Sequence, residues 1–123
     1  MYVELKTGHR DDGPAWIGKV KFSRSGRTVY FNGRALKRSG GQGIQGNHFD
    51  LETGEEYWVS GVKKDGSDRH WAGSGKIKIA ADVVDEYLAI VGQEQLDPSR
   101  FEVRRDIVDT DIGRFREIEN SGA

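Results

Sequence analysis

The sequence predicts a mainly β protein: a small SH3-like barrel or a strongly bent antiparallel sheet, with one α-helix and a C-terminal extension. Short apolar runs alternate with polar residues, which is the pattern of half-buried strands. The chain of 123 residues has 17 glycines and 2 prolines, which indicates many tight turns between these runs. In one later stretch, residues 82–91, the apolar residues recur with helical spacing instead. An OB-like barrel is the nearest alternative.

Eight stretches of the first eighty residues have the length and composition of strands. They are residues 2–6, 16–22, 27–31, 34–37, 48–51, 55–62, 69–72 and 76–79. In the second of them, alternation places Trp16, Val20 and Phe22 on the face opposite Lys19 and Lys21. The turn signals between the runs, above all Asn-Gly at 32–33, predict antiparallel hairpins. The glycine-rich residues 39–46 are expected to form a flexible connection.

An α-helix is predicted over residues 82–91. Apolar residues recur there with the spacing i, i+3, i+4 and i+7 that makes one helical face. They are Val84, Tyr87, Leu88 and Val91. Gly92 follows at the position where a glycine commonly ends a helix.

The last thirty residues predict a strand over 101–107, with a helix opened by Asp97-Pro98 as the alternative. A short helix follows over 110–119, with Thr110 as its N-terminal cap and Phe115 facing inward. We expect residues 1–92 to form a β-barrel domain with its helix. Residues 93–123 are then an extension docked on the same domain.

The charge layout is the most informative feature for function. The net charge is −1, yet residues 13–49 contain no acidic residue. The same stretch carries seven basic residues: Lys19, Lys21, Arg24, Arg27, Arg34, Lys37 and Arg38. Adjacent strands would gather them into a basic face for nucleic acid or another polyanion, with Tyr30 and Trp16 as stacking platforms. The alternative is an ordinary solvated face over a core that holds these aromatics.

A second candidate surface is the polar segment between two tryptophans, Trp58 and Trp71. Loops positioned by a barrel commonly carry binding residues. The candidate contacts in this segment are Lys63, Lys64, Arg69, His70 and Trp71. With Trp58, this region predicts an aromatic groove for a protein partner. The alternative is a plain hairpin loop whose base is anchored by a core Trp58.

Enzymatic and metal chemistry have little support. There is no cysteine and no serine nucleophile elbow, so covalent catalysis lacks its usual groups. A small enzyme would depend on His70 with nearby carboxylates such as Asp68. A metal site would require His48 and Asp50 to meet His70 and Asp68, because zinc needs three or four ligands. We expect no catalytic residues, no metal and no cofactor.

Several stretches of the chain resemble a small bacterial protein family. They are WIGKVKFS at 16–23, RTVYFNG at 27–33, EEYWVSG at 55–61 and DRHWAGSG at 68–75. The resemblance covers roughly residues 1–90 and implies no catalytic residues. Such chains are sometimes labelled deoxyxylulose-phosphate synthase. That enzyme needs large α/β domains to hold thiamine diphosphate, and one small β-rich domain cannot supply them.

Together these observations predict a small binding module. The leading hypothesis is nucleic acid or another polyanion on the basic face, and the alternative is a protein partner. We expect no membrane association, because no apolar run approaches the ~20 residues of a membrane helix. The N-terminal residues have no apolar segment of a signal peptide, so we expect a cytoplasmic protein.

Overall fold

The fold is given by a computed structural model, which describes residues 1–6, 13–38, 46–66 and 75–121, with side chains as far as residue 116. Within this part of the chain, nine strands form one sheet in the order β3-β4-β5-β6-β7-β1-β2-β8-β9. The strands are β1 Tyr2–Leu5, β2 Ala15–Ile17, β3 Lys21–Phe22, β4 Thr28–Phe31, β5 Arg34–Arg38, β6 His48–Asp50, β7 Glu56–Ser60, β8 Ile77–Ala80 and β9 Phe101–Arg104. The helices are a 3₁₀ turn at Ala81–Val83, α1 at Val84–Val91 and α2 at Ile112–Ser121.

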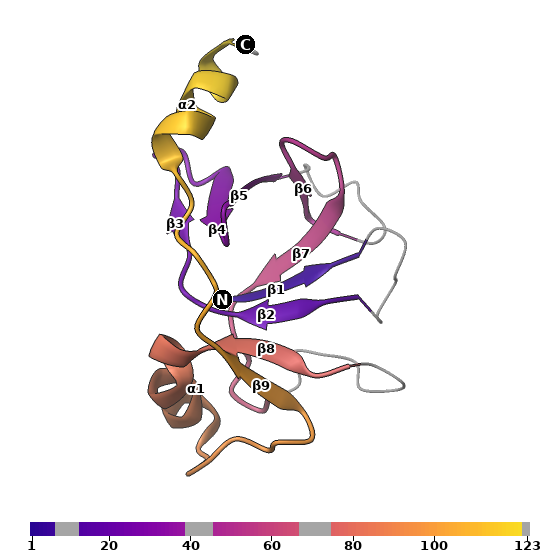
Figure 1. Cartoon of the computed structure of the whole chain (residues 1–123), viewed down its shortest axis with the longest axis vertical. Helices are drawn as coiled ribbons and strands as arrows, with labels where there is room; N and C mark the ends of the chain where they lie inside the picture. The colour runs from indigo at the N-terminus through magenta and orange to yellow at the C-terminus, as the bar shows by residue number, and fades with distance from the viewer. Residues whose placement is uncertain (7–12, 39–45, 67–74, 122–123) are drawn as a thin grey trace.

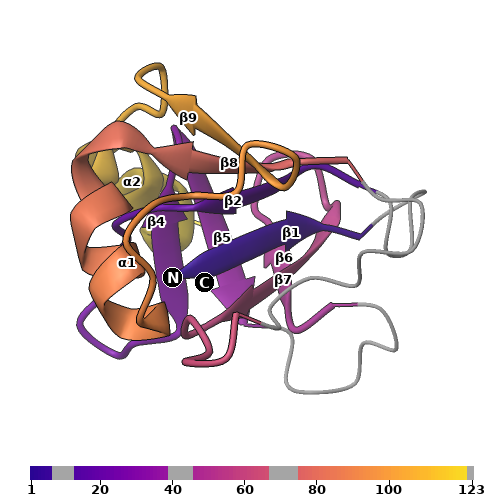
Figure 2. The ribbon, with the colours of Figure 1, turned by 90° about the horizontal axis from the view of Figure 1, so that it is seen from below.

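The sheet curls into a half-barrel, so strands that are not neighbours pack across its interior (Figures 1 and 2). Val29 of β4 and Leu36 of β5 join Val3 of β1 and Val59 of β7 in one buried cluster. Three strands separate β4 from β1 along the sheet, β4 and β1 not included. The mainly β, barrel-like class predicted from the alternation is therefore confirmed.

A second apolar cluster lies between α1 and the strands β1, β2 and β8. Tyr2, Ile17 and Ile79 pack there with Tyr87 of α1, and each of them is almost fully buried. Phe101 of β9 extends this cluster, because its ring centroid lies 5.3 Å from that of Tyr87. The sheet therefore has a core on each side, which explains why β1 is buried on both faces.

The C-terminal helix α2 packs on the outer side of β4 and β5. Phe115 is fully buried there against Tyr30 and Ala35, with Ile112 and Leu51 beside them. The part of the chain after Gly92 thus contributes a strand to the sheet and a helix that covers it.

The sheet is mixed rather than antiparallel, which differs from our expectation. β2 pairs with β8, and β8 with β9, in parallel. For β8 and β9 the reason is the connection, because the chain returns from β8 to β9 through α1, and a crossover through a helix joins parallel strands. The hairpin signals predict only the antiparallel pairs.

Residues 16–22 are not one strand. β2 ends at Ile17 and pairs with β1 and β8, whereas β3 begins at Lys21 and pairs with β4. Gly18 lies directly after β2, where the chain leaves that strand toward β3. The Phe31 ring packs so close to it that an added Cβ would lie 2.8 Å from the ring, which leaves no room for a side chain. The predicted inner face is wrong at Phe22, which is 55% exposed, whereas Trp16 and Val20 do pack against the core as partly buried residues. Ile17, expected on the other face, is also buried.

The predicted helix 82–91 is confirmed as a 3₁₀ turn followed by α1. Gly92 ends it in the left-handed region at φ 70°, and its N–H donates to the carbonyl of Leu88. Thr110 is not the cap of α2. Its hydroxyl donates to the Arg34 carbonyl at 2.9 Å, and Asp111 Oδ1 instead accepts the Arg114 N–H at 3.3 Å.

The predicted strand 101–107 is shorter than expected and ends at Arg104. Because β9 is an edge of the sheet, Val103 remains 44% exposed despite its apolar side chain. The expected strand at 69–72 lies outside the described residues.

Candidate functional site

The strand register distributes the predicted basic face over both sides of the sheet. Lys21 pairs with Tyr30, and Tyr30 pairs with Ala35, so Lys21 shares the outer side with α2. Arg34 and Arg38 alternate with Ala35 and therefore point to the other side, as Leu36 does. A run of like charges in the sequence thus becomes two separate groups in the sheet.

Arg34 already has a partner within the fold. Its guanidinium donates to Asp50 Oδ2 at 2.8 Å, and the Asp50 side chain is almost fully buried. Asp50 Oδ1 also accepts the backbone N–H groups of Glu52 and Thr53, so this carboxylate holds the β6–β7 turn. The hydrogen bond with Asp50 raises the pKa of Arg34 above its ordinary value. Arg34 therefore serves the sheet rather than a ligand.

Lys19 faces the N-terminal end of α1. Its Nζ lies 4.0 Å from Asp82 Oδ2, and both side chains are about two-thirds exposed. Exposed pairs of this kind contribute only ~0–1 kcal/mol, because water solvates both charges well. Lys19 therefore stays available to a ligand.

Three predicted cations gather at the β3 edge of the sheet. Lys21, Arg24 and Arg27 are exposed, and the described part of the chain offers them no ion pair. The turn that joins β3 to β4 is fixed by its backbone, since the Ser23 N–H donates to Thr28 O at 2.9 Å. We call Lys21, Phe22, Arg24 and Arg27 the β3 edge surface.

Arg24 borders a polar hollow of about 460 Å³ between this turn and α2. Arg116 of α2 also lines this hollow, together with the hydroxyl-bearing Ser23, Ser25 and Tyr30. Two guanidinium groups and several hydroxyls around one hollow are suited to an anion such as phosphate. Because Arg116 is distant in sequence, the charge run gave no sign of it.

The expected stacking platforms are not available on this surface. Tyr30 is only 4% exposed and lies beneath Phe115. Trp16 meets the Phe31 ring edge-on at 6.3 Å, and the Lys78 ammonium lies 5.8 Å from its ring centroid. The exposed aromatic ring is instead Phe22, which the alternation had assigned to the core.

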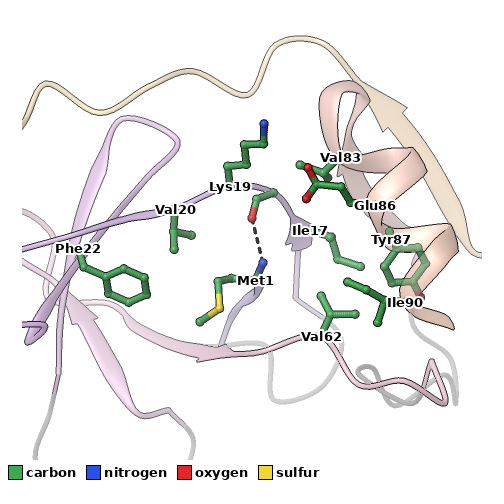
Figure 3. A pocket seen from close by; sticks show the side chains of 11 residues that line it. Met1, Ile17, Lys19, Val20, Phe22, Val62, Val83, Glu86, Tyr87 and Ile90 are labelled. Carbon is green, nitrogen blue, oxygen red and sulfur yellow. Dashed lines mark hydrogen bonds between the residues drawn. The ribbon is translucent and has the colours of Figure 1, made fainter.

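An apolar groove of about 350 Å³ opens beside Phe22 (Figure 3). It runs from the Phe22 ring to α1, where Tyr87 and Ile90 form the far wall. Met1, Ile17, Val20, Val62 and Val83 line it between these ends, together with Gly18. Two charged side chains, Lys19 and Glu86, stand at its rim. We call it the Phe22–α1 groove.

The second predicted surface is described only in part. Arg69, His70 and Trp71 lie outside the described residues, as does Asp68. Lys63 and Lys64 are exposed at a turn. The Gly66 N–H closes this turn by donating to the Lys63 carbonyl at 3.1 Å. The core role predicted for Trp58 is wrong, because its side chain is 42% exposed.

His48 is part of the β6–β7 packing rather than a surface group. Asn47 Oδ1 accepts the Val59 N–H at 2.8 Å, and His48 Nδ1 lies 2.8 Å from the same oxygen. Because an amide oxygen can only accept, His48 Nδ1 is the donor of this second hydrogen bond. Burial, with a smaller effect from Arg38, lowers the pKa of His48. In the described ranges, no group of three or more His, Asp or Glu side chains is placed to hold a metal ion.

Comparisons with known proteins add no assignment. The chain matches no protein-family model, no curated protein and no solved structure. Among the described residues, no helix has the length and apolar character needed to cross a membrane.

Proposed function

We propose that this protein is a small binding module for single-stranded nucleic acid, and that the strand lies along the β3 edge surface. The observation that carries the proposal is Phe22, an exposed ring on the edge strand with Lys21 before it and Arg24 after it. Binders of single strands combine cations along the backbone path with aromatic rings on which bases stack. Phe22 and Arg24 line the same hollow at this edge and supply both elements, and Lys21 adds a cation on the other face of β3, one residue before the ring.

The electrostatic surroundings support an anionic ligand at this edge. Two carboxylates of the nearest acidic cluster in the sequence, residues 50–56, form ion pairs within the fold. Asp50 is paired with Arg34, and Glu52 forms an ion pair with Arg114. Arg24, Arg27 and Arg116 therefore stand without a described acidic partner, which favours phosphate binding despite the net charge of −1.

A single strand fits this edge better than a duplex. The bases of a duplex are stacked on one another, so a lone Phe ring can stack only on an unpaired base. In addition, the β3 edge surface is built from a two-residue strand and a turn, and none of its residues belongs to a helix that could enter a major groove.

Fluorescence anisotropy with labelled single-stranded and duplex oligonucleotides tests the proposal at two salt concentrations. We expect the single strand to bind better. Its affinity should fall with salt with a log–log slope of about −2, since each of about three neutralised phosphates contributes ~0.7. Lys21→Glu with Arg24→Glu should abolish most of this affinity. The matched control, Lys76→Glu with Arg105→Glu, makes the same charge change at exposed residues next to β8 and β9, at the far end of the sheet. Equal loss in both pairs would contradict the proposal.

A protein partner is the second candidate, and the exposure of Trp58 favours it. Trp58 lies on β7 opposite Glu4 and presents an aromatic surface without a cover in the described chain. Binding through such a ring should respond little to salt, whereas phosphate contacts weaken steeply. Salt-insensitive binding that Trp58→Ala removes would favour the protein partner over the nucleic acid.

A further inference from the structure

The Phe22–α1 groove is continuous with the β3 edge surface, because Phe22 belongs to both. Its volume of about 350 Å³ is at the lower end of small-molecule sites, ~300–1,000 Å³. The lining is mostly aliphatic, with the Phe22 ring at one end and Tyr87 at the other. An occupant therefore needs an apolar face of limited size, and its polar groups must meet the rim.

The two sides of the rim carry opposite charges. Lys19 stands on the strand side, and with Lys21 it also lines a neighbouring hollow. Glu86 reaches toward the groove from α1 on the other side (Figure 3). An occupant that complements both sides is anionic near Lys19 and a hydrogen-bond donor near Glu86.

Glu86 is free to accept such donors. The neighbouring Asp82 lies 4.0 Å from Lys19, whereas Glu86 has no ion partner among the residues that the structure describes. An ionised carboxylate is an acceptor only, with two oxygens that suit a pair of adjacent donors. The Glu86 carboxylate thus favours an occupant whose edge presents two neighbouring N–H donors.

We infer that the Phe22–α1 groove takes one unpaired base of the bound strand, and that this base is guanine. Guanine presents its N1–H and its 2-amino group side by side, so both donate to the Glu86 carboxylate. Adenine, cytosine and thymine each place an acceptor beside their donor, and that acceptor would face the carboxylate unfavourably. The inference rests on the proposed function, since Lys19 at the rim and Arg24 beside Phe22 are the cations that would hold the phosphates next to this base.

The test uses a labelled oligothymidylate in which one central position is guanine, adenine or cytosine, in both the deoxyribose and the ribose form. We expect the guanine probe to bind about tenfold or more tightly than the others, as good bidentate base contacts discriminate by ~1–3 kcal/mol. The two sugar forms distinguish a DNA ligand from an RNA ligand. Equal affinity of guanine and adenine probes would overturn the inference.

Two variants separate Glu86 from the general charge of α1. Glu86→Gln keeps the size but replaces one acceptor with a donor, so the preference for guanine should disappear. Asp85→Asn removes the same charge from the adjacent exposed residue, which does not line the groove, and should preserve the preference. Equal effects of both variants on the preference would overturn the inference. Thermal unfolding of both proteins should match that of the unchanged chain, because both side chains are exposed.

Failure of the inference and failure of the proposed function give different results. If no probe binds even at low salt, the nucleic-acid function itself is wrong. If every probe binds through Lys21 and Arg24 with no base preference, the function stands and the groove is not a base site.

Discussion

Phe22 combines an apolar ring with high exposure at the edge of the sheet. Truncation of a core residue would lower the stability of the fold, whereas truncation of the exposed Phe22 is expected to weaken binding. Truncation to alanine should weaken single-strand binding by about 1–3 kcal/mol, the usual contribution of one base stacked on an aromatic ring. Anisotropy titrations measure this loss.

Two controls accompany this variant. Phe22→Tyr keeps the ring and should retain the affinity. Val103→Ala truncates an exposed apolar side chain on β9, the opposite edge of the sheet, and should have no effect. Unchanged binding by Phe22→Ala would remove the ring from the proposed site.

His48 makes the stability of the fold depend on pH. Burial lowers its pKa, so the folded state keeps the ring neutral at a pH where the unfolded chain already binds a proton. The free energy of unfolding should therefore fall as the pH drops below about 6.5, the ordinary value for histidine. Urea unfolding followed from neutral to mildly acidic pH measures this slope.

Replacement of His48 by glutamine should flatten that slope, because the titrating group is gone. Carboxylates do not obscure the result, since they titrate mainly near pH 4, below this window. An identical slope in His48→Gln would assign the pH dependence to another group.

At the scale of elements, α1 depends on its termination by Gly92. The positive φ of 70° costs a residue with a side chain about 1–2 kcal/mol. Gly92→Ala should accordingly lower the free energy of unfolding by about 1 kcal/mol. Gly61→Ala is the matched control, because an added Cβ meets nothing within 4 Å there. Equal stability of the two variants would show that the left-handed end is unimportant.

At the scale of the whole molecule, the C-terminal extension adds to the α1 cluster and builds a further cluster on β4 and β5. β9 places Phe101 against Tyr87, and α2 buries Phe115 against Tyr30. Loss of one buried Phe side chain typically costs ~3–5 kcal/mol, a large share of the ~5–15 kcal/mol that holds a domain together.

A chain that ends at Gly92 should therefore melt at a much lower temperature or fail to unfold cooperatively. Circular dichroism melts of the shortened and full-length chains measure this difference. Equal melting temperatures would instead support a domain complete within residues 1–92, with a dispensable extension.

The sequence by itself determined the β-rich class, most strands, the helix at 82–91 and its end at Gly92. These features depend on neighbours close in the chain: alternation, turn residues and helical spacing. The basic stretch also pointed to Lys21, Arg24 and Arg27, which do lie exposed at one edge.

Only the tertiary structure decided what these residues face. The break between β2 and β3 at Gly18 leaves Phe22 exposed. The sheet register places Arg34 and Lys21 on different sides, and Arg34 forms an ion pair with Asp50. α2 covers Tyr30 and brings Arg116 to Arg24. Each of these outcomes depends on contacts between residues far apart in the chain. Local periodicity contains no information about them, because it reports which side of a strand a residue occupies and not what packs against that side.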